Sequence, residues 1–234
     1  MRSIYFLIIL TVYSCAGFCQ DTVNVTDING HKQGFWRKRD SAGQIIYEGR
    51  FRDGVPTGEF RYYYSNGKIK TISMLSNQGK KAVTTSYFTN GRKMAAGNYI
   101  NEKKDSTWQF YSESNGTIVS EEHYNAGQID GISQVFYPEG GLSEIHYYKK
   151  NIRDGKCEQY YLDGKIKLRC AYKAGEKQGV FQTWYNSGQL MIIGQYNAGH
   201  QDGTWIYYDE KGGISKKEIY HEGSLVKVEE PIKN

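Results

Sequence analysis

The chain has 234 residues, of which 38% are hydrophobic and 15% aromatic, and 21 of them are tyrosine. This apolar content is too low for a large compact core, whereas tyrosine suits a surface that is buried on one side and hydrated on the other. The 30 basic and 25 acidic residues leave a net charge of +5 and are interspersed, which is typical of a solvated surface and argues against nucleic-acid binding.

The first 20 residues are unlike the rest of the chain. Arg2 precedes an apolar run over residues 4–12, and small residues follow. This order is typical of a secretory signal peptide, and the apolar run is too short for a transmembrane helix. We therefore expect residues 1–20 to be removed by cleavage near Cys19 or Gln20.

A bacterial lipobox is an alternative interpretation of the same segment. Residues Val12-Tyr13-Ser14-Cys15 resemble that motif, which would place a lipidated Cys15 at the mature N-terminus. Either route predicts an exported protein that resides in the periplasm, at the outer membrane or outside the cell. Export also predicts an oxidising environment for the remaining cysteines.

From residue 34 onward the sequence repeats every 24 residues, as Gly155, Gly179 and Gly203 show, with one residue inserted between Ser106 and Gly131. Each unit has an opening residue, a turn glycine and a closing residue, which is usually aromatic. The opening residues are Gly34, Gly58, Ala82, Ser106, Gly131, Gly155, Gly179 and Gly203. The turn glycines are Gly43, Gly67, Gly91, Gly116, Gly140, Gly164, Gly188 and Gly212. The closing residues are Phe51, Leu75, Tyr99, Tyr124, Tyr148, Tyr172, Tyr196 and Tyr220. A fixed period of this length indicates a repeat architecture in which each unit contacts its neighbours.

Each unit consists of two β-rich runs around a glycine-bearing turn, which predicts a β-hairpin. Residues 34–223 are therefore expected to form an all-β, elongated, single-layer antiparallel sheet of about eight hairpins. Residues 21–33 are a polar lead-in, and the charged tail at 224–234 is expected to be either a disordered end or a polar cap. The third unit, which opens at Ala82, is expected to bend or fray, and the last unit to keep only its turn and return strand.

A two-residue turn fixes the register of each hairpin. It places Trp36 opposite Gly49, Phe60 opposite Ser73 and Tyr64 opposite Ile69. Rings set across from small residues cover the backbone, so this face is expected to be the better-buried one. The same register assigns an aliphatic column to that face: Ile45, Ile69, Ile118, Leu142, Ile166, Leu190 and Ile214.

The opposite face carries a second aromatic column with lysines around it. Tyr63 is expected to face Lys70 and Tyr160 to face Lys167, with a cation–π contact of about 0.5–1 kcal/mol each. Two interpretations remain: the rings and lysines hold a thin sheet together, or they form a ligand-binding face. The candidate binding face consists of Tyr63, Lys70, Tyr87, Tyr111, Tyr160, Lys167, Trp184 and Tyr208.

Cys157 and Cys170 are the only cysteines expected after cleavage near Gln20. A turn at Asp163-Gly164 places them directly opposite each other as a non-hydrogen-bonded pair, whose Cα atoms lie about 4.5 Å apart. In an oxidising compartment this geometry predicts a cross-strand disulfide. The alternative is that two small thiols merely fill a position that holds a ring elsewhere.

No pattern in the sequence indicates catalysis. The five histidines fall at unlike repeat positions, and no metal-ligand spacing joins them to a cysteine. No nucleophile elbow, phosphate loop or dinucleotide fingerprint is present. We therefore expect a protein that is not an enzyme and that needs no cofactor or metal.

The glycines and aromatics follow the pattern G-x-[YF]-x-x-G-x-x-x-G-x-[WF], for example over residues 49–60 and 194–205. This pattern resembles the MORN repeat, and more closely the variant form found in bacterial secreted and envelope proteins. The resemblance covers residues 30–223 and implies an extended sheet with a role in scaffolding, protein contact or lipid association. Some bacterial relatives carry an antitoxin label.

The resulting hypothesis is a secreted or envelope-associated module that binds an unknown protein partner or acts as a scaffold. One alternative is peripheral binding to anionic lipid or glycolipid through the lysine and tyrosine face. A second alternative is an antitoxin-like or immunity role with a toxin as partner.

Overall fold

The computed structural model describes residues 22–230, so the expected signal peptide and Cys15 lie outside the described residues. The described part is built from strands, and no helix in it could span a membrane. The strands are β1 (Val25–Thr26), β2 (Lys32–Arg39), β3 (Ile45–Arg52), β4 (Val55–Tyr63), β5 (Ile69–Ser76), β6 (Lys81–Tyr87), β7 (Lys93–Ile100), β8 (Lys103–Tyr111), β9 (Ile118–Asn125), β10 (Gln128–Phe136), β11 (Leu142–Lys149), β12 (Ile152–Tyr160), β13 (Ile166–Lys173), β14 (Glu176–Lys177), β15 (Gly179–Trp184), β16 (Leu190–Asn197), β17 (His200–Tyr208), β18 (Ile214–His221) and β19 (Ser224–Glu229).

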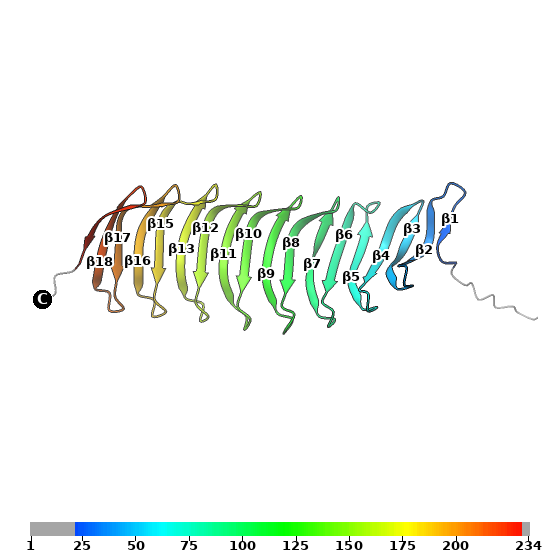
Figure 1. Ribbon diagram of the computed structural model, residues 1–234, viewed down its shortest axis with the longest axis horizontal. Coiled ribbons are helices and arrows are strands. Elements are labelled where there is room, and N and C mark those ends of the chain that lie inside the picture. The colour runs from blue at the N-terminus through cyan, green and yellow to red at the C-terminus, as the bar shows by residue number, and fades with distance from the viewer. Residues whose placement is uncertain (1–21, 231–234) are drawn as a thin grey trace, which may run out of the picture.

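The strands form one open antiparallel sheet in chain order. Each strand pairs with the next, except that β14 and β15 both pair with β13 and together make one interrupted strand. Figure 1 shows a single row of strands along the long axis, with turns at both long edges and the first and last strands at opposite ends. This arrangement confirms the elongated single-layer fold expected from the repeats.

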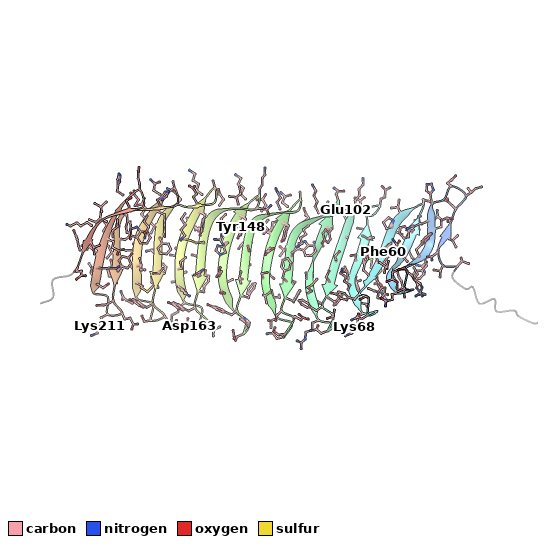
Figure 2. All side chains as sticks on the ribbon, viewed as in Figure 1. Phe60, Lys68, Glu102, Tyr148, Asp163 and Lys211 are labelled. Carbon is pink, nitrogen blue, oxygen red and sulfur yellow. A yellow bond between two sulfur atoms is a disulfide. The ribbon has the colours of Figure 1, made fainter. Side chains whose placement is uncertain are left out.

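The two long edges carry different turns. Between units the turn has two residues of positive φ, as at Ala198 (φ 45°) and Gly199 (φ 82°). Within a unit only the glycine has positive φ: Gly67 (φ 78°) donates its N–H to the carbonyl of Tyr64, and the N–H of Tyr64 donates to the carbonyl of Lys68. This within-unit turn therefore contains one residue more than a two-residue turn. The turn of the fourth unit, where the N–H of Ser112 donates to the carbonyl of Thr117, contains two more. Figure 2 labels Lys68, Asp163 and Lys211 along this edge and Glu102 at the other.

The additional turn residue shifts the register only near the turn. Trp36 pairs with Gly49 and Phe60 with Ser73, as expected, but Tyr63 rather than Tyr64 pairs with Ile69. The expected assignment of the aliphatic column to the better-buried face is therefore wrong. These aliphatic residues are the cross-strand partners of the second aromatic column, in the pairs Tyr63–Ile69, Tyr111–Ile118, Phe136–Leu142, Tyr160–Ile166, Trp184–Leu190 and Tyr208–Ile214.

Most opening glycines mark a β-bulge. Gly58 has a φ of 70°, and the register between β3 and β4 shifts beside it. Ser106 adopts the same left-handed conformation with a φ of 62°. At Ala82, by contrast, β5 and β6 pair without a shift, and the turn before β6 is longer, with positive φ at Asn77, Gln78 and Gly79. The third unit therefore neither frays nor leaves the sheet.

The core is one row of side chains that crosses the strands along the whole ribbon. Trp36 and Phe181 in this row are half-buried. The other three large rings are almost fully buried, with Phe60 3%, Trp108 2% and Trp205 2% exposed. Each of these three rings lies on a glycine of the preceding hairpin, as Trp108 does on Gly97. We call this the central row; it runs through Trp36, Gly49, Phe60, Ser73, Thr84, Gly97, Trp108, Glu122, Ser133, His146, Cys157, Cys170, Phe181, Gly194, Trp205 and Glu218.

Both ends of the ribbon are more regular than expected. The last unit is a complete hairpin, since β17 pairs with β18 from Gly203–Tyr220 to Tyr208–Ile214. Residues 224–229 of the charged tail form β19, which pairs with β18 as an edge strand rather than a disordered end. In the lead-in, the N–H of Gly30 donates to the carbonyl of Asp27 and closes a turn.

Candidate binding faces

The sheet has two faces of different character. The ring face carries the central row and the closing aromatics, whose rings pack edge to face, as Tyr99 does on Trp108 at 4.9 Å between centroids. The stripe face carries the second aromatic column with its aliphatic partners. We define the stripe as Tyr63, Ile69, Tyr87, Lys93, Tyr111, Ile118, Phe136, Leu142, Tyr160, Ile166, Trp184, Leu190, Tyr208 and Ile214.

Lysines cover the rings of the ring face. The Nζ of Lys104 lies 4.6 Å from the ring centroids of Trp108 and Phe110 and 4.7 Å from that of Tyr124. Burial lowers the pKa of this ammonium group. Lys32 and Lys177 occupy the same repeat position and lie over rings in the same way. Because the long side chains pack on the rings, these lysines belong to the core rather than to a free basic surface.

The stripe face pairs its charges internally. The hydroxyl of Tyr160 donates to Oε2 of Glu158 at 2.7 Å, and the Nε of Arg169 donates to the other carboxylate oxygen at 2.9 Å. Burial and the hydrogen bond to Glu158 raise the pKa of Tyr160 to about 12. In the second unit the hydroxyl of Tyr63 donates to Glu48 at 2.7 Å. The basic groups on this face are thus largely neutralised by neighbouring carboxylates.

The structure separates the aromatics of the candidate binding face from its two lysines, Lys70 and Lys167. Its six aromatics all lie on the stripe, where each is half-buried: Tyr63, Tyr87, Tyr111, Tyr160, Trp184 and Tyr208. The expected contacts from Lys70 to Tyr63 and from Lys167 to Tyr160 are wrong. The Nζ of Lys70 lies 5.8 Å from the ring of Tyr64, and that of Lys167 lies 5.7 Å from the ring of Tyr161, because the turn shifts the register by one residue.

A set of tyrosines that the sequence analysis missed links successive units. The hydroxyl of Tyr161 donates to the backbone carbonyl of Trp184 at 2.6 Å. Equivalent bonds run from Tyr64, Tyr137 and Tyr185 to the same position of the next unit. The available signal was a tyrosine that recurs directly after the stripe aromatic. These bonds fix the spacing of neighbouring units, and hence of the stripe.

The disulfide lies within the central row. Cys157 pairs with Cys170 and is bonded to it, with 5.0 Å between the Cα atoms. On the other side, Cys157 pairs with His146, whose Nε2 contacts Glu144 at 2.9 Å and whose buried Nδ1 has no hydrogen-bond partner. These residues occupy a part of the row that has no phenylalanine or tryptophan ring. The disulfide therefore replaces ring packing in this part of the core.

No group of three metal-ligating side chains comes together within residues 22–230. The same residues offer open hollows on both faces rather than an enclosed cavity. What this surface presents is a repeated pattern of rings, aliphatic groups and paired charges.

Comparison with known proteins identifies the repeat. No curated protein matches the chain. One solved structure, described as "Crystal Structure of TarM", aligns at 13% identity over 50% of this chain and 21% of that chain, with a TM-score of 0.31. This chain thus spans about a fifth of that chain's length. Four segments match the MORN repeat variant family, at residues 56–77, 129–150, 153–174 and 177–198. These four segments are repeats of the MORN variant type.

Proposed function

We propose that this protein is a non-catalytic, exported repeat module that binds another protein along its stripe face. The observation that carries the proposal is the stripe itself, a line of aromatic and aliphatic side chains, most of them half-buried, that runs from Tyr63 to Ile214 with Lys93 as its one charged member. Exposed apolar groups lie beside it on the same face, including Val83 (64% exposed) and Val180 (55% exposed). Aromatic residues are enriched at the centres of protein interfaces.

The dimensions of the stripe fit a protein partner. Two strands per unit advance by roughly 9.6 Å, so the aromatics from Tyr63 to Tyr208 span roughly 60 Å before twist shortens the sheet. An element of roughly 12 Å width, such as a helix, would cover roughly 700 Å² along this line, close to the ~800 Å² that each partner buries in a stable complex.

The charge pattern favours a protein over an anionic lipid surface. Binding to such a surface needs several unpaired basic groups that face it together. On the stripe face Arg37 is bonded to Glu48, and Arg169 to Glu158. Paired charges of both signs instead suit the polar rim of a protein interface.

Site-specific photo-cross-linking tests the proposal. A photoreactive phenylalanine analogue is placed at Val83 or Val180 on the stripe face, and at Lys38 on the ring face as a control. After irradiation of cells that express the full chain, we expect the same protein adduct from both stripe positions and none from Lys38. Adducts from Lys38 alone would contradict the proposal. So would the absence of protein adducts together with salt-sensitive sedimentation on anionic vesicles, an outcome that would favour lipid binding.

A further inference from the structure

The central row is interrupted between Phe60 and Trp108. Three positions of the row lie between these rings: Ser73, which is 8% exposed, Thr84, which is 4% exposed, and Gly97, which Trp108 covers. Thr84 stands two residues after the opening position, where Trp36, Phe60 and Trp108 stand in other units. The third unit therefore lacks the ring that the first, second and fourth units place over the sheet.

An open hollow of ≈ 510 Å³ occupies this position on the ring face. Tyr62 lines it on one side and Tyr99 on the other. Its floor carries two hydroxyl pairs that cross β5 and β6: Ser73 with Thr84 at 2.9 Å, and Thr71 with Ser86 at 3.1 Å. Hollows of 300–1,000 Å³ with aromatic walls and a few polar groups are typical of small-ligand sites.

The hydroxyl groups of the floor can still both donate and accept hydrogen bonds. A hydroxyl has one donor and two acceptor lone pairs. When two hydroxyls share one hydrogen bond, the pair keeps one O–H donor and three acceptor lone pairs. Such a surface matches a ligand whose own groups both donate and accept, as sugar hydroxyls do. The ring walls offer flat apolar surfaces that fit the C–H face of a pyranose.

Lysines supply positive charge at the rim. Lys80 occupies the repeat position of Lys32, Lys104 and Lys177, which lie over rings. Because Thr84 replaces the ring, the exposed side chain of Lys80 has no ring beneath it and lines the hollow. Lys70 also lines the hollow, and Glu102 is the only acidic residue within 22–230 that does. The rim therefore has an excess of positive charge.

We propose that this hollow binds an acidic saccharide, a pyranose unit that carries a carboxylate. The sugar ring lies between Tyr62 and Tyr99, its hydroxyls bond to the paired hydroxyls of the floor, and its carboxylate pairs with Lys80. This site is on the face opposite the stripe, so it is independent of the proposed protein-binding function.

Calorimetric titration of the full mature chain tests the site. The probes are trigalacturonate, trimannuronate and a glucuronate-containing trisaccharide, and the methyl ester of trigalacturonate is the uncharged control. We expect at least one acidic probe to bind at low salt. We expect affinity to fall about fivefold or more on esterification or in Lys80→Gln, since each removes one partly exposed charge pair. Lys173→Gln, an exposed lysine on β13, should leave binding unchanged.

Thr84→Phe supplies the decisive variant. It restores the ring found in neighbouring units, fills the hollow and should abolish binding, while circular dichroism and the melting temperature show that the sheet is retained. Lys80→Gln is an exposed change in a turn and tests the same site without altering the core. Failure of all three acidic probes at millimolar concentration would overturn the proposal. Equal binding of ester and acid, or full binding by folded Thr84→Phe, would overturn it as well.

Discussion

The indole of Trp108 lies directly on the backbone of Gly97. A Cβ at residue 97 would stand 2.4 Å from the ring, and the corresponding distances are 2.5 Å for Gly49 beneath Phe60 and 2.2 Å for Gly194 beneath Trp205. A ring from one hairpin thus covers the glycine of the hairpin before it. Because the contact crosses the boundary between units, it packs neighbouring units against each other.

Gly97→Ala should therefore destabilise the protein. The methyl group would displace a ring that is 2% exposed, and overpacking of this kind costs about 1–3 kcal/mol. The measurement is the midpoint of thermal or denaturant unfolding. Ala96→Ser, one residue away and on the stripe face, is the control and should change stability little. Equal shifts for the two variants would contradict the contact.

The sequence predicted the repeat and the central register because period and hairpin pairing depend on positions far from the turn, such as Trp36 and Gly49. It did not predict the pairing of Tyr63 with Ile69, since Asn66-Gly67 suits both a two-residue turn and the longer turn observed. The additional turn residue is the reason why the aliphatic column lies on the stripe face rather than on the ring face. The hollow at Thr84 was equally hidden, because it arises from a ring that one unit lacks.

Restoring glycine at the two deviating opening positions should have opposite effects. Ser106 has a φ of 62°, where a side chain costs about 1–2 kcal/mol, so Ser106→Gly should stabilise the protein by up to about 1 kcal/mol after loss of the hydrogen bond from its Oγ to Asp105. Ala82 lies in regular pairing, so Ala82→Gly should destabilise by about 0.5–1 kcal/mol. If both variants shifted the melting temperature in the same direction, the backbone conformations at Ser106 and Ala82 would not differ as described.

The tyrosine bonds between units predict a stabilising substitution. Phe88 stands at the position of Tyr64 and Tyr161 but has no hydroxyl. Phe88→Tyr should donate to the carbonyl of Tyr111 and add about 0.5–1.5 kcal/mol, whereas Tyr161→Phe should remove a similar amount. Differential scanning calorimetry checks both. A loss of stability in Phe88→Tyr would mean that the third and fourth units are spaced differently.

Stability should fall in acid through the carboxylates of the stripe face. The hydrogen bond from the Tyr160 hydroxyl lowers the pKa of Glu158 below its ordinary value, and Arg169 adds a smaller effect in the same direction. A carboxyl group with a lowered folded pKa contributes its full stability above its unfolded pKa and loses it as pH falls through the folded pKa. Unfolding midpoints measured from pH 7 to pH 2 should therefore decrease below about pH 4.3. Glu158→Gln should be less stable at neutral pH and show a shallower acid decrease; an unchanged slope would contradict this role.

The disulfide provides the last prediction, because it links stability to the compartment. Cys157 and Cys170 are separated by 13 residues and already face each other in a hairpin. Reduction should therefore cost less than the ~3 kcal/mol expected for a 15-residue loop, since the paired strands close the loop without the bond. Calorimetry with and without reductant measures this cost, and Cys157→Ser with Cys170→Ser is the control that should no longer respond to reductant. Alkylation of the native protein followed by intact mass should find neither cysteine modified when the protein is exported. Both cysteines would be modified in a protein held in a reducing cytoplasm, and that result would contradict the proposed export.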